Sequence, residues 1–187
     1  MQSLRLTCPW LPRPRPGAGA RHRGFTAIEL MVTIAILAVL SALAAPSFTP
    51  IMERWRVRQA AEELQSTIYF ARSESIKRGG GVTIQAIGKD WNGGWQVTHT
   101  ANGTTTELQN FSVPANTAFT LKDDAQGAIS VDRWGMLSHG TSAGAAVAMD
   151  FLITPKGKDQ NAAGAARLCI SQGGRAQQKK GSDSCST

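Results

Sequence analysis

One carboxylate stands alone inside a long apolar stretch of the chain. Phe25 to Ala45 contains 21 residues, and Glu29 is the only charged one among them. At a helical rise of about 1.5 Å per residue, this segment spans a bilayer core of roughly 30 Å. An ionised side chain costs free energy in hydrocarbon unless it meets an opposite charge. Glu29 is therefore predicted to have a function, and charge pairing is the chemistry that it can supply.

No other group of residues predicts a catalytic or metal site. His99 and His139 stand among glycine, threonine and serine without metal-ligand spacing, and we interpret them as solvated loop residues. There is no nucleophile elbow, phosphate-binding glycine loop or metalloprotease motif, and the glycines at 79–81 are not followed by Lys-Ser/Thr. We expect no enzyme activity, no metal and no cofactor.

The apolar segment has two interpretations. A secretory signal peptide would have a shorter apolar core and a small-x-small cleavage site, which residues 41–46 loosely supply. Glu29 argues against it, because a carboxylate weakens a signal core. The run Arg23-Gly24-Phe25-Thr26-Ala27-Ile28-Glu29 instead resembles the N-terminus of a type IV prepilin or pseudopilin, and Pro46 stands where that family has a helix-kinking proline.

The prepilin resemblance implies a processed N-terminus. Residues 1–24 would be a leader that prepilin peptidase cuts between Gly24 and Phe25, and the new N-terminus of Phe25 would be methylated. Residues 25–45 would then form the transmembrane helix. The leader is long and rich in proline and arginine, so we expect it to be disordered. A start codon further downstream, at one of the leader's leucines, is an alternative.

Charges predict how the segment is oriented. Arg21, His22 and Arg23 come directly before it, so the positive-inside rule places that end in the cytoplasm and the bulk of the chain outside the inner membrane. The leader holds five of the 20 Lys and Arg and none of the 13 acids, so its removal lowers the formal charge from +7 to +2. The basic composition alone therefore does not predict nucleic-acid binding.

The cysteines that remain after cleavage are Cys169 and Cys185, since Cys8 belongs to the leader. The periplasm is oxidising, which favours a disulfide between them over two free thiols. A zinc site is disfavoured because no histidine accompanies them. The disulfide would close a loop of about 17 residues and contribute on the order of 3 kcal/mol.

Residues 46–78 are expected to continue the helix as an amphipathic segment that ends at Gly79. We predict that one face packs on a sheet and that charged residues occupy much of the rest. The predicted packing face comprises Ile51, Trp55, Leu64, Ile68, Ala71 and Ser75.

After Gly81 the chain changes to short β-type runs separated by turn residues, which predicts an antiparallel sheet in an α+β domain. We interpret Trp91 and Trp95 as core aromatics beside a turn. The predicted strands are 82–87, 94–100, 105–111, 119–121, 128–131, 146–153 and 167–171.

The order of several blocks resembles the GspH/FimT family of minor pilins and pseudopilins. The blocks are residues 71–84, 90–95, 129–135 and 167–175, and the similarity covers residues 23 to 176. The resemblance implies a type IV pilin-like α+β fold. A long N-terminal helix, with a transmembrane first half, would pack on a β-rich head at 79–171, and residues 172–187 would form a basic C-terminal tail.

The family's function would be filament assembly, in the manner of a FimT-like minor type IV pilin. In this family Glu29 is thought to neutralise the N-terminal amine of a neighbouring subunit as it enters the filament, which would make a buried carboxylate tolerable and fix the axial register. The expected partners are prepilin peptidase, other pilins or pseudopilins, and the inner membrane.

DNA is a further expected partner. Arg175, Lys179 and Lys180 lie in a flexible, polar tail that would contact phosphates of double-stranded DNA without reading sequence, during natural transformation. FimT-like pilins carry Gly-Arg-x-Arg there, whereas this chain has Gly174-Arg175-Ala176-Gln177, and lysines replace a bidentate arginine only as point charges. A solvated basic tail held by the disulfide is the alternative.

The alternative to a type IV pilin is a minor pseudopilin of the H type at the tip of a type II secretion pseudopilus, which shares this fold. The Cys169/Cys185 loop and the basic tail favour the pilin.

Overall fold

The computed structural model describes residues 24–44, 48–88, 90–122 and 127–185. The chain divides into two compact units, one ending at Leu43 and one beginning at Ala44. Residues 1–23 of the predicted leader, and Pro46, lie outside the described residues. The two units are treated separately below.

The first unit contains helix α1, Ala27–Ala44, within the predicted 25–45. Its two central hydroxyls are bonded inside the helix, from Thr33 to the Leu30 carbonyl and from Ser41 to the Leu37 carbonyl. Such bonds satisfy polar side chains without water. Among the described residues, no helix combines the length and the hydropathy that a membrane span requires.

The second unit begins with helix α2, Thr49–Arg78, which has a proline in its first turn and Lys77 and Arg78 in its last. Its end at Gly79 is confirmed. Gly79 adopts the left-handed conformation with φ 78°, and the Gly80 amide donates to the Ser75 carbonyl at 2.9 Å. This is the usual glycine cap, because a residue without Cβ adopts positive φ without strain.

The prediction for the packing face of α2 was right in its second half and wrong in its first. Leu64, Ile68, Ala71 and Ser75 are buried, but Ile51 and Trp55 are 58% and 60% exposed. Burial begins only at Val57, and in the two preceding turns Glu53 pairs with Lys158, which follows β7, at 2.6 Å. The buried residues of α2 are Val57, Ala60, Ala61, Leu64, Thr67, Ile68, Ala71 and Ser75.

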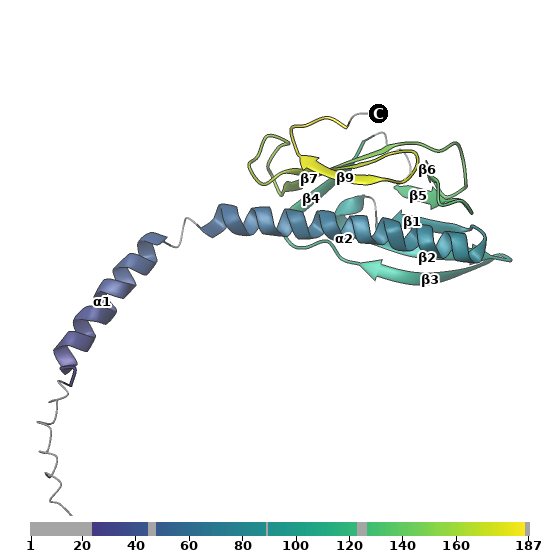
Figure 1. Cartoon of the computed structure of the whole chain (residues 1–187). Helices are drawn as coiled ribbons and strands as arrows, with labels where there is room; N and C mark the ends of the chain where they lie inside the picture. The colour runs from purple at the N-terminus through teal and green to yellow at the C-terminus, as the bar shows by residue number, and fades with distance from the viewer. Residues whose placement is uncertain (1–23, 45–47, 89, 123–126, 186–187) are drawn as a thin grey trace, which may run out of the picture. The chain divides into compact units, whose positions relative to one another are not determined.

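The strands form two antiparallel sheets rather than one, and α2 packs against strands of both (Figure 1). The first sheet has the order β3-β2-β1-β5-β6 and the second β4-β7-β8-β9. In chain order the strands are β1 Val82–Ala86, β2 Trp95–Ala101, β3 Thr104–Phe111, β4 Thr117–Leu121, β5 Ala128–Val131, β6 Leu137–His139, β7 Met149–Pro155, β8 Ala166–Ile170 and β9 Ala176–Lys180.

All seven predicted strands are present, with ends shifted by a few residues. Two strands were missed. β6 has only three residues, and β9 has the polar sequence AQQKK, which lacks the β-branched and aromatic residues typical of strands. Both depend on a neighbour for their conformation, since β6 pairs with β5 and β9 pairs with β8.

Aromatic side chains join the helix and the two sheets in one core. Trp91 and Trp95 are 3% and 0% exposed, which confirms their interpretation as core residues. Trp91 meets Phe151 of the second sheet edge-on at a ring-centroid distance of 5.3 Å. The buried indole of Trp95 donates to the Thr67 hydroxyl on α2 at 3.1 Å, so its polar atom has a partner.

Candidate functional site

Glu29 lies in the first turn of α1, at the end of the helix that a cut after Gly24 would leave next to the new N-terminus. Thr26 begins the helix, since its hydroxyl accepts the Glu29 amide at 3.2 Å and its carbonyl accepts the Leu30 amide at 3.2 Å. A carboxylate in the first turn is favoured by the helix dipole. Phe25 is 79% exposed, and no atom lies within 4 Å of a Cβ built on Gly24. The Gly24-Phe25 bond is therefore open to the surroundings in the first unit.

Apolar side chains project from α1 in every direction. A surface helix of a soluble domain has one apolar stripe, whereas a helix that is apolar all round requires an apolar environment on all sides. The exposed apolar residues of α1 are Ile28, Leu30, Met31, Val32, Ile34, Ile36, Leu37, Val39, Leu40 and Leu43. Glu29 is the only charged residue among them.

The predicted basic tail is not a flexible segment. Residues 176–180 form β9, which pairs with β8 in register from Ala166↔Lys180 to Ile170↔Ala176. Lys179 also donates from Nζ to the Ser184 carbonyl at 3.0 Å. The expectation that this region lies outside the sheet was wrong, because the backbone of β8 offers it a complete partner.

Strand pairing separates the three basic residues that the sequence grouped together. Successive side chains of a strand point to opposite faces. Lys179 therefore lies on the outer face of the second sheet, while Lys180 shares the other face with Gln178, whose amide donates to Gln65 of α2 at 3.2 Å. Arg175 precedes β9, and because its carbonyl accepts the Ser171 amide at 2.9 Å it continues the pairing by one residue and shares the face of Lys179. Arg175 and Lys179 stand four residues apart, about 13 Å along the chain at 3.3 Å per residue, so they share a face without being in contact.

The predicted disulfide is confirmed. Cys169 of β8 and Cys185 are bonded, with 16 residues of sequence separation and Cα atoms 5.5 Å apart. The bond ties the segment after β9 to the outer face of the second sheet, beside Lys179. On the same face Arg167 and Asp150 form an ion pair of 2.7 Å between Nη1 and Oδ2.

Arg72 connects this region to the rest of the second unit, a role that its place in the sequence did not predict. Its guanidinium donates to the carbonyls of Gly135 at 2.7 Å, Gly174 at 2.9 Å and Gly173 at 3.1 Å. One side chain of α2 therefore holds the turn after β5 and the turn between β8 and β9. The sequence shows only an arginine next to Ala71 of the predicted packing face. That position does not distinguish an arginine that holds two turns together, here called the Arg72 clamp, from an arginine that is solvated.

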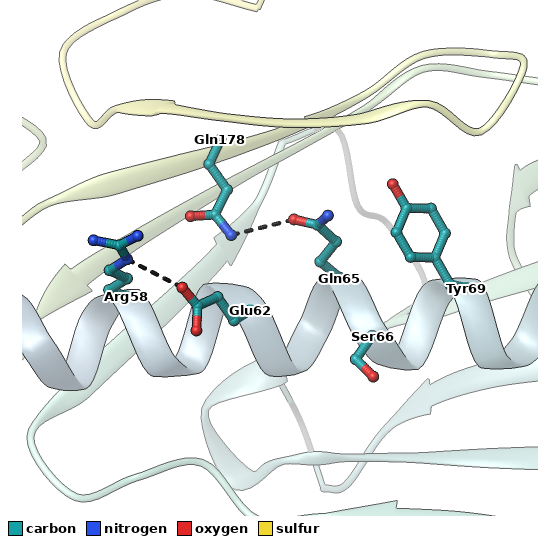
Figure 2. A pocket seen from close by; sticks show the side chains of 6 residues that line it. All are labelled: Arg58, Glu62, Gln65, Ser66, Tyr69 and Gln178. Carbon is teal, nitrogen blue, oxygen red and sulfur yellow. Dashed lines mark hydrogen bonds and ion pairs between the residues drawn. The ribbon is translucent and has the colours of Figure 1, made fainter.

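A polar groove of about 540 Å³ runs between α2 and β9 (Figure 2). Its lining residues are Arg58, Glu62, Gln65, Ser66 and Tyr69 of α2 and Gln178 of β9. Arg58 and Glu62 form an ion pair of 3.0 Å, so the groove carries no net charge from this pair. In Figure 2, Gln178 points across the groove towards Gln65.

The two histidines are not in loops, so that interpretation was wrong. His99 lies in β2 and His139 in β6, and both are partly buried. The strand of His99, β2, is paired with β1 and β3. The strand of His139, β6, is paired with β5, and its Leu137 carbonyl accepts the Val147 amide of the following segment. Over the part of the chain that the structure describes, no three His, Cys, Asp or Glu side chains gather where they could hold a metal ion.

Two family models match the chain. The model described as type II transport protein GspH matches residues 60–176, which is more than half of the chain. The model of the prokaryotic N-terminal methylation motif matches residues 19–45.

Curated relatives and solved structures include proteins that are similar to this chain. Two fimbrial proteins of Pseudomonas aeruginosa are 35% identical over 69 residues, or 37% of this chain and 44% of theirs, so the match spans less than half of the relatives' length. The type IV minor pilin FimU of Pseudomonas aeruginosa is similar with a TM-score of 0.54 and 26% identity, covering 70% of this chain and 92% of that one. The minor pseudopilin EpsH of the Vibrio cholerae type 2 secretion system has a TM-score of 0.50 and 10% identity, covering 69% and 99%, which shows the fold alone.

Proposed function

The chain belongs to the GspH family, and on this premise we propose that it is a minor subunit of a type IV pilus-like filament. Before assembly the chain is anchored in the inner membrane with its second unit in the periplasm, and it then enters the filament. One observation carries the proposal. Residues 19–45 match the N-terminal methylation motif, and α1 within that match exposes apolar side chains all round, with Glu29 as its only charged residue.

Processing at Gly24-Phe25 prepares the chain for assembly. Prepilin peptidase removes the leader, which leaves a positive amine on Phe25 one turn before Glu29. The apolar side chains of α1 are buried first in the bilayer and then in the helical core of a filament. Both environments are apolar and remove these side chains from water.

Glu29 is proposed to pair with the N-terminal amine of a neighbouring subunit. A lone carboxylate within an apolar filament core is tolerated when it gains an opposite charge, and the pairing fixes the axial register. The test compares Glu29→Gln, which removes only the charge, with Glu29→Ala. Both variants should reach the membrane at wild-type level and be at least tenfold depleted in sheared filaments probed by immunoblot. Wild-type recovery of either variant in filaments would remove this role from Glu29.

The choice between a pilus and a secretion pseudopilus rests on the solved relatives. The likeness to FimU includes sequence identity of 26%, whereas the likeness to EpsH is one of fold. We therefore propose a type IV pilin, similar to FimT, over a pseudopilin of the H type. Deletion of the gene should abolish or reduce surface pili and leave protein secretion intact, and the opposite pattern would assign the chain to the secretion system.

Non-specific binding of double-stranded DNA is a second candidate function. It is supported by Arg175 and Lys179, which share the outer face of the second sheet next to the Cys169–Cys185 bond. Phosphate contacts of this kind weaken steeply with salt. In a gel shift, Arg175→Ala should weaken binding several-fold and Lys179→Ala less, because its ammonium already donates to Ser184.

Lys180→Ala is the control for this test, because its side chain lies on the opposite face from Arg175. It should bind DNA as the wild type does. Absence of binding by the wild-type chain, or equal loss in all three variants, would argue against a DNA site on the outer face.

A further inference from the structure

We propose that a groove at the start of α2 binds the headgroup of an anionic phospholipid, and that an apolar stripe of the same helix rests on the bilayer beside it. The stripe comprises Phe48, Ile51, Met52 and Trp55. The ligand is the phosphodiester of a membrane lipid. This inference rests on the proposed function, because it requires a chain that is anchored in the inner membrane before assembly.

The apolar stripe lies on the side of α2 that faces away from the core. Its four residues follow the helical spacing i, i+3, i+4 and i+7, which places them on one face. Val57 comes about two and a half turns after Phe48, at 3.6 residues per turn, and is buried on the opposite side. The side chains of the stripe are 46% to 60% exposed. A cluster of large exposed apolar residues marks a contact with a membrane or another protein.

The position of the stripe in the chain favours the bilayer as its partner. Phe48 follows Ala45, the end of the predicted membrane segment, by three residues, and three residues of extended chain span at most about 11 Å. The headgroup layer adds about 5 to 8 Å to each side of the hydrocarbon core. The stripe therefore begins at or near the headgroups for any arrangement of the two units. It contacts the bilayer when the start of α2 lies along the surface, and Trp55 is of a residue type enriched in this layer.

A groove beside the stripe presents two cations. It has a volume of about 410 Å³ and lies between the first turns of α2 and the residues where β4 begins and β7 ends. Within residues 24–44, 48–88, 90–122 and 127–185, neither Arg56 nor Lys156 forms an ion pair. The acid in the lining is Glu53, which pairs with Lys158 at 2.6 Å. The lining residues are Phe48, Thr49, Met52, Glu53, Arg56, Asn116, Pro155 and Lys156.

The lining of the groove suits a lipid headgroup better than a free anion. The guanidinium of Arg56 can donate to two phosphate oxygens at once, and Lys156 adds a positive charge from the segment after β7. Phe48 and Met52 line the same groove and also belong to the stripe, so the apolar part of a bound lipid would continue onto the stripe. Inorganic phosphate would gain nothing from these two apolar side chains.

Phospholipid binding by the full chain tests the groove. Native mass spectrometry follows a titration of the detergent-purified chain with phosphatidylglycerol and, in parallel, with phosphatidylcholine. Arg56→Gln and Lys156→Gln should each weaken the binding of phosphatidylglycerol about fivefold, the usual contribution of one basic residue near an anionic lipid surface. Binding of phosphatidylcholine should not change. Equal affinity of the wild type for the two lipids would overturn the site.

Arg58→Gln is the matched control, because it removes the same charge from α2 outside the groove. It should weaken the binding of phosphatidylglycerol less than twofold. Equal losses in Arg56→Gln and Arg58→Gln would reduce the effect to general charge attraction and overturn the site. Excess inorganic phosphate should leave the lipid bound, and displacement of the lipid would show a site for free phosphate instead.

Fluorescence quenching tests the stripe. The full chain is reconstituted in vesicles of equal parts phosphatidylglycerol and phosphatidylcholine, with a spin label on the headgroup. The fluorescence of Trp55, obtained as the difference between the wild type and Trp55→Phe, should be at least halved by the label. Trp134 is the control. It is also exposed, but its turn is held by Arg72, which lies about 36 Å further along α2 than Phe48. The fluorescence of Trp134, obtained with Trp134→Phe, should not change.

Carbonate extraction of the same vesicles separates this site from the proposed function. Unquenched Trp55 in a chain that resists extraction would overturn the lipid contact, assign the stripe to a protein partner and leave the proposed function standing. Release of the chain from the vesicles by carbonate would overturn both, because the chain would then have no membrane anchor.

Discussion

Arg72 donates from Nη1 to the carbonyl oxygen of Gly174 at 2.9 Å, across 102 residues of sequence. The same guanidinium bonds to the carbonyl of Gly135, in the turn between β5 and β6 of the first sheet. The fixed geometry of a guanidinium holds the two carbonyl oxygens within about 8 Å of each other. The turns that carry Trp134 and Arg175 are therefore neighbours on the second unit, although nothing in their local sequences joins them.

Arg72→Ala should destabilise the second unit by about 2 to 4 kcal/mol, because it removes three charged hydrogen bonds and leaves partly buried carbonyls without donors. Urea unfolding of a fragment starting at residue 48 measures this, since all core residues lie between Val57 and Ile170. The control is Arg58→Ala, whose ion pair is largely exposed and should contribute under about 1 kcal/mol. Equal effects of the two substitutions would contradict the clamp.

Gly174→Ala should be more costly than Gly103→Ala. Both glycines have φ +77°, so both substitutions carry the strain of a left-handed alanine, about 1 to 2 kcal/mol. A Cβ on Gly103 meets nothing within 4 Å, whereas one on Gly174 would overlap the guanidinium of Arg72. The excess cost of Gly174→Ala in urea unfolding should disappear in an Arg72→Ala background, and its persistence there would show that the clamp is not its cause.

Cys185→Ser should lower the free energy of unfolding by about 3 kcal/mol, the loop-closure value for a separation of 16 residues. In the same fragment, a reductant should destabilise the wild type by a similar amount and leave the variant unchanged. β9 should persist, because its pairing with β8 does not require the disulfide. Loss of slow amide exchange at residues 177 and 179 in the variant would show instead that the disulfide holds the strand.

Glu74 should give a pH dependence to stability. Hydrogen bonds from Lys77 and then Arg78 lower the pKa of the Glu74 carboxyl below its ordinary value of 4.5. A carboxyl with a lowered folded pKa stabilises the fold above its unfolded pKa, and this contribution is lost as pH falls through the folded pKa. Glu74→Gln should therefore lower the urea midpoint at pH 7 and not at pH well below the folded pKa. An equal shift at both pH values would point to packing rather than charge.

The sequence by itself determined the features that depend on near neighbours in the chain. The apolar run with Glu29, the glycine end of α2 at Gly79 and the seven predicted strands all follow from local pattern, because helix capping, amphipathicity and strand propensity act over a few residues. The pairing of Cys169 with Cys185 also followed, since only two cysteines remain after the predicted cleavage.

Only the tertiary structure decided the features that depend on contacts between distant segments. The polar residues 176–180 are a strand because β8 lies beside them, and that pairing turns Lys180 away from Arg175. Exposure of Ile51 and Trp55 depends on which parts of α2 the rest of the unit covers. The role of Arg72 depends on three glycine carbonyls, which a turn of each sheet brings to it. Such contacts join residues far apart in sequence, so no local pattern encodes them, and they become visible only when the chain has folded.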